Sequence, residues 1–369
     1  MGSKTKVLIV IENALDIGGV QNVMMSIVRN LHEEVDFDIV VTNKKQGYYD
    51  EEFLRYGKIH IIERRKKAGL KSIFVDEKAT KQKIEKLLSE EKYDAVYCNN
   101  MFNAGVFLKA AKKAGVPLRI VHSQVAGQSK IKLRSKILYA IKRKKIVKNA
   151  TDFLAVTQNS ADFLFGKKIA TKKALVVKNP VIDIADFTLL QDKTNADEIR
   201  LLHLGYLSPR KNATFSVCVL EELVKLDKNF RLTVAGNGDT GYIQLVRDLI
   251  ESKGLTEYIR FVPDFVDSKE ELTKHNYIIL PSLVEGLPCL LLEGQVVGTK
   301  CFVSDAVETI CDQGLCAFLP LEKGAAYWAE QIYAEYKANG GKKTPVDMTD
   351  WDSAVICKRY QNLFEGKGF

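Results

Sequence analysis

The 369-residue sequence contains no run of about 18 or more apolar residues, which excludes a conventional membrane-spanning helix. The first apolar run, residues 7–11, is too short for the core of a signal peptide, so we interpret it as a buried strand. Seven cysteines are present, an odd number, and no two pairs have the spacing of a zinc site. We therefore expect reduced thiols and a cytoplasmic protein.

Several common catalytic patterns are also missing. The sequence has no G-x-G-x-x-G fingerprint, no phosphate-binding loop ending in Gly-Lys-Ser/Thr, no Ser/His/Asp signature and no His/Cys cluster for a metal. A nicotinamide dehydrogenase is therefore disfavoured. Asp36-Phe37-Asp38 resembles a metal-binding Asp-x-Asp motif, but it alternates at the start of a strand, and we interpret it as an ordinary polar strand face.

The net charge of +9 is divided unevenly along the chain. Residues 1–180 hold 35 Lys and Arg against 18 Asp and Glu, a balance of +17, whereas residues 181–369 have a balance of −8. Such asymmetry indicates that the first half meets an anionic partner, either a polyanion or a membrane surface.

Short apolar runs alternate with helical patterns of period 3.6 almost throughout the chain. This alternation predicts an α/β protein with parallel, doubly wound sheets. The pattern restarts after Asn179-Pro180, at a new strand over residues 200–204. We therefore predict Rossmann-like domains at residues 1–180 and 181–350, and a helix over 351–369 that packs back on the first domain. Ligands of such sheets bind at the carboxyl ends of the strands.

Two loops carry the features of an anion site. Gly18 and Gly19 lie between the first strand and the first helix, where the free N–H groups and the positive end of a helix are available. Arg210 and Lys211 lie at the head of the helix that follows the first strand of the second domain. Cations are disfavoured there by the helix dipole, so a bound phosphate explains them better than solvent does.

Two carboxylates and a histidine complete the candidate site. Glu285 lies in a turn after a buried strand, and Glu293 follows inside an otherwise apolar helix. A carboxylate in such a helix needs a partner, and a sugar diol is a suitable one because it donates two hydrogen bonds. His122 ends a predicted strand and so is expected at the ligand-binding edge of the first sheet, although a core histidine has the same pattern.

Taken together, these residues resemble the family 4 retaining glycosyltransferases of the GT-B fold, which has two Rossmann-like domains. The resemblance covers nearly the whole chain. It rests mainly on Glu285-x7-Glu293, with Gly18-Gly19, Lys211-Asn212 and the glycine-rich turn Gly236-Asn237-Gly238 in support. His122-Ser123 is similar to bacterial enzymes of exopolysaccharide and capsule synthesis.

The resemblance implies transfer of a hexosyl or N-acetylhexosaminyl group from a nucleotide-sugar, usually UDP-linked, to a polysaccharide or lipid-linked acceptor. Neither a metal nor a cofactor is implied. Catalytic roles are implied for His122, Lys211 and Glu285. Donor contacts are implied for Gly18, Gly19, Arg210, Lys211, Asn237, Gly238, Val262, Pro263, Glu285, Gly286, Leu287 and Glu293.

One departure from the family pattern leaves alternatives open. The family commonly has arginine directly after the glycine at position 205, where this chain has Tyr206. Either Arg210 replaces this second diphosphate cation, or the donor is held more weakly. A catalytically weak or inactive GT-B partner or regulatory subunit is therefore one alternative. A nucleotide-sugar epimerase, another GT-B chemistry, is a further alternative.

The basic charge of the first half concentrates in residues 64–67 and 130–148, and the latter segment mixes Lys and Arg with Ile and Leu. Mixed apolar and basic helices bind anionic membrane surfaces. No recognition motif for nucleic acid accompanies them. We therefore expect peripheral attachment at the inner face of the cell membrane, with a solvated helix face as the alternative.

Overall fold

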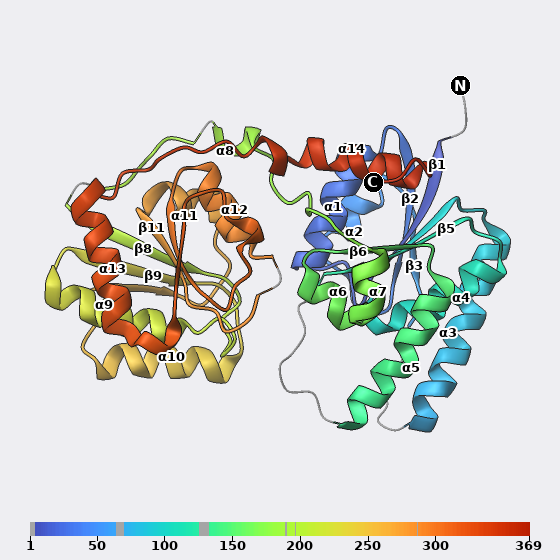
Figure 1. The fold of residues 1–369 in the computed structure, drawn as a ribbon, viewed down its shortest axis with the longest axis horizontal. Coiled ribbons are helices and arrows are strands. Elements are labelled where there is room, and N and C mark those ends of the chain that lie inside the picture. Colours follow the sequence, from blue (N-terminus) through green and yellow to red (C-terminus); the bar gives the residue numbers. More distant parts are fainter. Residues whose placement is uncertain (1–3, 64–69, 125–132, 189, 196, 286) are drawn as a thin grey trace. The chain divides into compact units, whose positions relative to one another are not determined.

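The computed structural model describes residues 4–63, 70–124, 133–188, 190–195, 197–285 and 287–369. The chain forms two compact units (Figure 1). Unit 1 comprises Met1–Val181 together with Asp350–Phe369, and unit 2 comprises Ile182–Thr349. The sequence had put the break at residue 180.

Unit 1 is built on a parallel sheet of seven strands in the described part of the chain, in the order β3-β2-β1-β4-β5-β6-β7. The strands are β1 (Thr5–Val10), β2 (Val35–Val41), β3 (Ile59–Ile61), β4 (Ala95–Cys98), β5 (Leu118–Ser123), β6 (Asp152–Ala155) and β7 (Ala174–Val176). The order reverses between β1 and β4, as in a doubly wound sheet. The central strands β1 and β4 are apolar over residues 7–10 and 95–98 because helices cover both faces of the sheet.

The helices of unit 1 form two layers around this sheet (Figure 1). They are α1 (Gly19–Leu31), α2 (Asp50–Phe53), α3 (Leu70–Glu90), α4 (Ala104–Lys113), α5 (Leu133–Asn149), α6 (Gln158–Phe165), α7 (Lys167–Lys173) and α14 (Ser353–Phe364). Side chains of α3 to α6 share one hydrophobic core, and those of α1 and α14 share the other. None of the described helices is apolar enough over a sufficient length to cross a bilayer.

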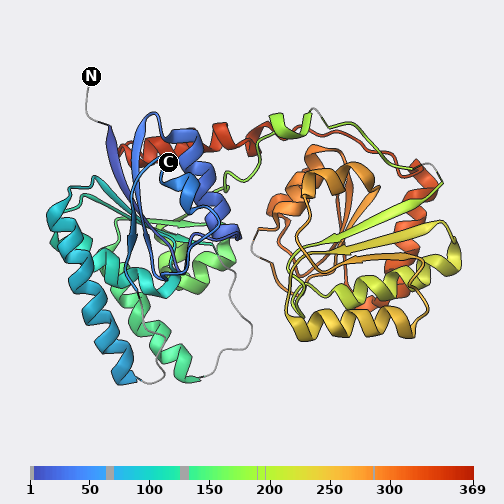
Figure 2. The same cartoon turned by 180° about the vertical axis from the view of Figure 1, so that it is seen from behind.

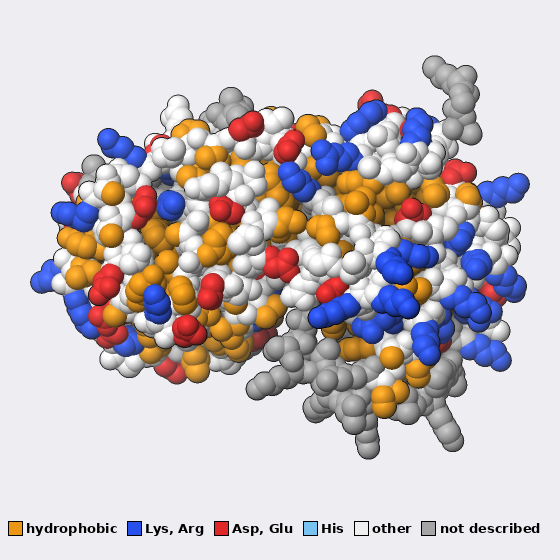
Figure 3. Space-filling view, viewed as in Figure 1, with side chains coloured by type: hydrophobic (Ala, Val, Ile, Leu, Met, Phe, Trp, Pro, Cys, Tyr) orange, Lys and Arg blue, Asp and Glu red, His pale blue; other side chains and the backbone are white. Residues whose placement is uncertain are grey.

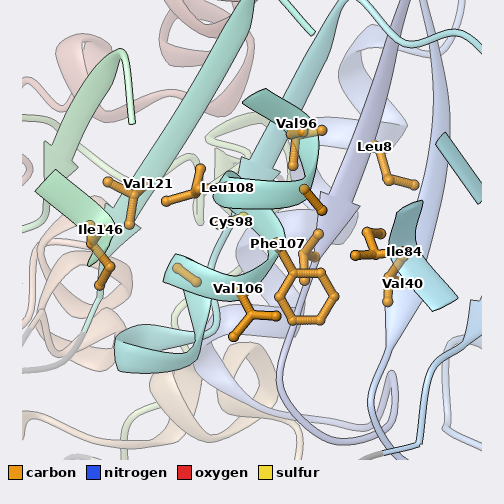
Figure 4. Close-up of a cluster of buried hydrophobic side chains, with 14 of the residues drawn as sticks. Leu8, Val40, Ile84, Val96, Cys98, Val106, Phe107, Leu108, Val121 and Ile146 are labelled. Atoms are coloured by element: carbon orange, nitrogen blue, oxygen red, sulfur yellow. The ribbon is translucent and has the colours of Figure 1, made fainter. Parts of the chain in front are cut away.

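The core under α4 shows why this helix forms where it does. Val106, Phe107 and Leu108 are buried, and Phe107 points into the space beside Ile84 of α3 (Figure 4). The strand residues Leu8, Val96, Cys98 and Val121 supply the opposite wall, in agreement with the apolar runs of the sequence. This packing fixes the ends of β4 and β5, which carry the polar residues described below.

The C-terminal helix α14 belongs to unit 1, although the chain reaches it only after unit 2. It packs against α1, where the Ser26 and Ser353 hydroxyls are 3.4 Å apart. Its Tyr360 and Phe364 rings contact the Tyr97 ring of β4, with centroids 6.1 and 5.6 Å away. The side chains of α14 are therefore part of the core of the first sheet.

Unit 2 has a parallel sheet of six strands among the described residues, in the order β10-β9-β8-β11-β12-β13. Its strands are β8 (Ile199–Leu204), β9 (Phe230–Ala235), β10 (Ile259–Val262), β11 (Tyr277–Leu280), β12 (Lys300–Ser304) and β13 (Cys316–Leu319). Its helices are α8 (Ala185–Thr188), α9 (Ala213–Leu226), α10 (Thr240–Ser252), α11 (Ser268–Lys274), α12 (Cys289–Val296) and α13 (Gly324–Asn339). Helices α9 and α13 pack side by side (Figures 1 and 2). The edge strand β13 and helix α13 were not predicted.

The interpretation of Asp36-Phe37-Asp38 as an ordinary polar face was wrong in one respect. Asp36 is exposed, but Asp38 is only 3% exposed. The Asp38 carboxylate accepts hydrogen bonds from the Lys58 amide at 2.8 Å and the Tyr93 hydroxyl at 2.7 Å, and Lys6 lies 3.3 Å away. Burial by itself raises the pKa of Asp38. These contacts, together with a hydrogen bond to His60, outweigh burial and hold the pKa well below its usual range. Asp38 is therefore a buried structural charge.

Candidate functional site

Two glycine turns pack against each other at the carboxyl ends of β8 and β9. Gly205 and Gly236 have φ angles of 149° and 129°, a region that favours glycine. A Cβ atom on Gly236 would lie 2.1 Å from the Gly205 carbonyl oxygen, so only glycine permits this approach. Beyond the glycines, the Leu207 amide donates to the Asn237 carbonyl at 2.7 Å. These contacts bring Asn237 and Gly238, two predicted donor residues, to the same edge of the sheet as Lys211.

The loop after β8 is also tied to the loop after β11. Asn212 has a left-handed φ of 59°, and its side-chain amide donates to the Pro281 carbonyl at 3.2 Å. The Leu283 amide donates to the Arg210 carbonyl at 2.8 Å. Because the loops are joined at two points, residues some 75 positions apart in the chain meet at the head of α9.

These joined loops form a cluster of Arg210, Lys211 and Glu285. The Glu285 side chain is buried, with Lys211 Nζ 2.7 Å from its Oε1 and Arg210 Nη1 3.2 Å from its Oε2. Lys211 is largely buried, whereas the Arg210 side chain is half exposed and also donates to the Val284 carbonyl. Two cations against one carboxylate leave a local excess of positive charge. The cluster can therefore attract an anionic group such as a diphosphate.

Glu293 lies on α12, and Pro288 precedes the first residue of this helix. Its carboxyl is partly buried, and burial raises its pKa, while a hydrogen bond with Ser268 at the start of α11 acts in the opposite direction. The helix sits close to the sheet because Gly294 faces Ile278, whose Cδ1 would be 2.2 Å from an added Cβ. Glu293 thus lies in the helix in which the sequence placed it, with Ser268 as a hydrogen-bond partner, and its role toward a sugar diol stays a prediction.

Tyr206, at the position where arginine was expected, does not contact the Glu285 cluster. Its side chain is 53% exposed, and its hydroxyl donates to Asp239 Oδ1 at 2.9 Å. Asp239 precedes α10. The second cation beside Glu285 is Arg210, and its replacement of the expected arginine on a diphosphate stays a prediction.

The remaining predicted donor residues of unit 2 lie in neighbouring loops. The Val262 carbonyl, at the end of β10, accepts from the Gly236 amide at 3.0 Å and from the Asp264 amide at 2.8 Å. This joins the segment Val262-Pro263 to the glycine turn. Leu287 is half-buried just before α12, and Gly286 lies outside the described residues.

Gly18 and Gly19 of unit 1 lie at the start of α1. Gly18 is extended, with φ near 178°, and a Cβ on Gly19 would meet nothing within 4 Å. Backbone geometry therefore does not demand glycine at position 19. A bare backbone at a helix start is the arrangement that lets a ligand approach the N–H groups closely.

His122, at the end of β5, is buried and only 1% exposed. Its Nδ1 lies 2.7 Å from the Tyr97 hydroxyl, and its Nε2 has no hydrogen-bond partner among the described residues. Burial lowers the pKa of His122 to about 3, so the ring is neutral at physiological pH. The predicted place at the strand end is correct, but the ring is deeper than a surface histidine would be.

The structure adds polar residues around His122 that sequence reasoning did not single out. Tyr97, Asn99 and Gln124 lie at the ends of β4 and β5, and Asn179 follows β7. Asn99 and Asn179 are buried. The available signal was the cluster of amide side chains directly after the apolar strands, which is typical of a ligand-binding edge.

The chain matches two family models in succession. Residues 17–183 match the model described as Glycosyltransferase Family 4, and residues 187–313 match that of Glycosyl transferases group 1. Over 364 residues the chain is 25% identical to the putative glycosyltransferase EpsF of Bacillus subtilis, covering 95% of this chain and 92% of EpsF. It is 26% identical over 284 residues to the capsular polysaccharide biosynthesis glycosyltransferase CapH of Staphylococcus aureus, covering 75% of each chain.

Solved structures agree on the fold. Anabaena HepE in complex with UDP superposes with a TM-score of 0.73 at 13% identity, covering 97% of this chain and 95% of HepE. The lipopolysaccharide glycosyltransferase WaaG superposes with a TM-score of 0.67 at 13% identity, covering 98% of this chain and all of WaaG. With the two parallel sheets in place, the predicted fold is confirmed: this chain is a glycosyltransferase of the GT-B fold, and its two successive domains match the models of Glycosyltransferase Family 4 and Glycosyl transferases group 1.

Proposed function

We propose that the protein transfers a hexosyl or N-acetylhexosaminyl group from a UDP-sugar, with retention at the anomeric carbon, to a saccharide or lipid-linked acceptor of exopolysaccharide or capsule synthesis. The observation that carries the proposal is the cluster of Arg210 and Lys211 on Glu285. The names of EpsF and CapH support the type of product, and the UDP in HepE supports the donor.

In this proposal unit 2 binds the donor and unit 1 binds the acceptor. Departure of the nucleoside diphosphate builds negative charge on the leaving oxygens, and Lys211 and Arg210 neutralise it without reorganising. The two cations do here what a divalent metal does in other transferases, so the reaction is metal-independent. Glu285 orients both cations and accepts a hydrogen bond from the donor sugar.

The nucleoside part of the donor lies along the neighbouring loops of unit 2. Glu293 accepts hydrogen bonds from the ribose hydroxyls, and the segment Val262-Pro263 faces the base. The backbone N–H groups of Gly286 and Leu287 hold the diphosphate together with the glycine turn at Asn237 and Gly238. In unit 1, Gly18 and Gly19 offer bare backbone N–H groups suited to a phosphate, and His122 offers a ring nitrogen suited to a sugar hydroxyl.

A thermal-shift screen tests the donor class. UDP at about 100 times its dissociation constant stabilises a native site by about 2.7 kcal/mol, so we expect UDP and UDP-sugars to raise Tm by several degrees. GDP at the same concentration should produce a much smaller shift. In Lys211→Met the UDP shift should largely disappear. A GDP-specific shift, or a nucleotide-sugar that is epimerised without any acceptor product, contradicts the proposal.

The proposed membrane surface lies on unit 1, where Lys and Arg side chains gather over α7 and the helices beside it (Figure 3). Arg143 of α5 joins these helices by donating to the Phe163 and Leu164 carbonyls of α6. Ile137 and Ile141 of α5 are 59% and 50% exposed. The basic surface consists of exposed Lys144, Lys148, Lys167, Lys168, Lys172 and Lys173. Residues 64–67 and 130–132 of the predicted basic segments lie outside the described residues.

Ile137, Ile141, Lys144 and Lys148 follow one another at helical spacing, so a single stripe along α5 carries apolar and then basic side chains. This stripe suits the boundary between acyl chains and anionic headgroups. Each lysine near an anionic bilayer contributes about 1 kcal/mol, so six are sufficient for peripheral binding. We propose that this surface attaches the enzyme to the inner face of the cell membrane, where a lipid-linked acceptor is available.

Vesicle co-sedimentation tests this attachment. We expect binding to phosphatidylcholine vesicles that contain phosphatidylglycerol and little binding to pure phosphatidylcholine. Charge reversal to Glu at the four α7 lysines should abolish the binding. The matched control reverses four exposed lysines of unit 2, namely Lys228, Lys323, Lys337 and Lys342. Equal binding to both kinds of vesicle, or equal loss in both variants, would rule out this surface.

A further inference from the structure

A continuous chain of polar side chains surrounds His122 in unit 1. Gln124 is at its centre: its Nε2 donates to Asn99 Oδ1 at 2.7 Å and lies 3.4 Å from His122 Nδ1. The Gln124 Oε1 accepts from Asn179 Nδ2 at 3.3 Å. His122 Nδ1 is also 2.7 Å from the Tyr97 hydroxyl. Three different strand ends therefore meet through one half-buried glutamine.

The donor and acceptor of each hydrogen bond can be assigned by starting from the Asn99 side chain. Asn99 Nδ2 faces the Met24 thioether at 3.3 Å, and a thioether accepts but cannot donate. Asn99 must then present its Oδ1 to Gln124, and this oxygen needs a donor. Gln124 therefore turns its NH₂ group toward Asn99, and the same NH₂ group faces His122 Nδ1. An amide nitrogen never accepts, so Nδ1 is the acceptor.

The proton of the neutral ring must then be on Nε2, because a neutral imidazole has one N–H group and one acceptor nitrogen. The Tyr97 hydroxyl fits this assignment, since it can donate to Nδ1 at 2.7 Å. Nε2 is buried, and no described residue accepts from it. An unpaired buried N–H group is costly unless a ligand or water pairs with it.

The surroundings also favour the neutral ring. Burial alone lowers the pKa of His122 to about 3. The rings of Tyr97 of β4 and Tyr360 of α14 pack against His122, and the Cys357 thiol of α14 lies near both tyrosines. Burial raises the pKa of each of these groups, that of Cys357 to about 12, so all are uncharged near neutral pH. No described charge is therefore available to stabilise an imidazolium.

We propose that Gln124 is a positioning residue that, with Tyr97, holds His122 as the neutral Nε2–H tautomer, so that His122 serves the substrate only as a hydrogen-bond donor. This inference rests on the proposed transferase function for the identity of the acceptor atom, a sugar oxygen. The proposed role differs from that of a general base, because a general base would need an unprotonated Nε2 or a ring that titrates near pH 7. Asn99 and Asn179 hold Gln124 in the required orientation.

Histidine-selective ¹⁵N NMR of the full chain tests the tautomer directly, with His122→Asn used to assign the signal. We expect a neutral Nε2–H pattern without titration between about pH 5 and pH 9. Gln124→Glu replaces the amide donor by a carboxylate that only accepts, so His122 should gain a proton on Nδ1 and titrate near neutral pH. A wild-type His122 that carries its proton on Nδ1, or that titrates near its ordinary pKa, would overturn the inference.

Activity measurements complete the test. In Gln124→Glu we expect kcat to fall at least about tenfold, with a new pH dependence that follows the His122 titration, while UDP affinity stays unchanged because unit 2 holds the nucleotide. Gln82→Glu, an exposed site on α3, is the matched control and should alter neither spectrum nor rate. A changed tautomer with unchanged kcat overturns the inference. A wild-type protein with the expected tautomer but no transferase activity supports the tautomer assignment and rejects the proposed function instead.

Discussion

Glu285→Gln is expected to lower kcat/KM for sugar transfer by about 10²- to 10³-fold, the effect of losing one preorganised electrostatic contact at a charged transition state. The wild-type carboxylate holds Lys211 Nζ at 2.7 Å and Arg210 Nη1 at 3.2 Å. A neutral amide of the same size cannot neutralise either cation, so both would leave the positions at which the diphosphate oxygens need them. Steady-state kinetics with a UDP-sugar measure the change.

The same substitution also costs stability, because it leaves Lys211 largely buried without its counter-charge, at roughly 3–5 kcal/mol. Glu271→Gln is therefore the matched control. Glu271 is 4% exposed, lies on α11 of the same unit and pairs with Arg260 away from the cluster. Both variants should be destabilised in urea, and only Glu285→Gln should lose catalysis. If both lose activity equally at matched folded fraction, Glu285 is structural and has no direct role.

Gly236→Ala is expected to destabilise unit 2 by about 3 kcal/mol or more, because a positive φ and a steric clash act together. The added Cβ would lie 2.1 Å from the Gly205 carbonyl oxygen, and this neighbour is backbone that cannot turn away. The φ of 129° is itself unfavourable for alanine. Urea unfolding at neutral pH, followed by circular dichroism, measures the loss.

The control for this prediction is Gly241→Ala in the same unit. Gly241 lies in the first turn of α10, and a Cβ there would meet nothing within 4 Å. Alanine is the better helix former by about 1 kcal/mol, so this variant should be as stable as the parent or slightly more stable. If Gly236→Ala has the same urea midpoint of unfolding as the parent protein, the close backbone approach does not hold the loops after β8 and β9 together.

The strands that position the site could be predicted because their sequences are continuous apolar runs. The strands expected at residues 7–11 and 200–204 are observed as β1 (Thr5–Val10) and β8 (Ile199–Leu204). Inner strands of a parallel sheet are covered on both faces, so the hydrophobic effect alone selects their residues. β13 escaped prediction because an edge strand is only half covered: Cys316, Ala317 and Phe318 are only partly buried.

The members of the unit 2 cluster could also be predicted, but not their distances. Arg210 and Lys211 are adjacent, and the family resemblance placed them and Glu285 in the same donor site. Only the structure shows that Arg210 is the second cation beside Glu285. Tyr206 lies at the position where arginine was expected, but its hydroxyl donates to Asp239. The conformation of a loop determines which of its neighbouring side chains faces a site, and composition carries no information on that conformation.

By itself, the sequence determined the two α/β units, the division of charge between them, the family, and the residue types at the carboxyl ends of the strands. These properties follow from local periodicity and from residue chemistry, both of which can be read from residues that are close together in the sequence. Only the tertiary structure decided which of these groups touch: the backbone contact of Gly205 with Gly236, the two cations on Glu285, and the burial of His122 against Tyr97. Each of these depends on elements far apart in sequence, whose packing sets distances and dielectric surroundings that no single segment encodes.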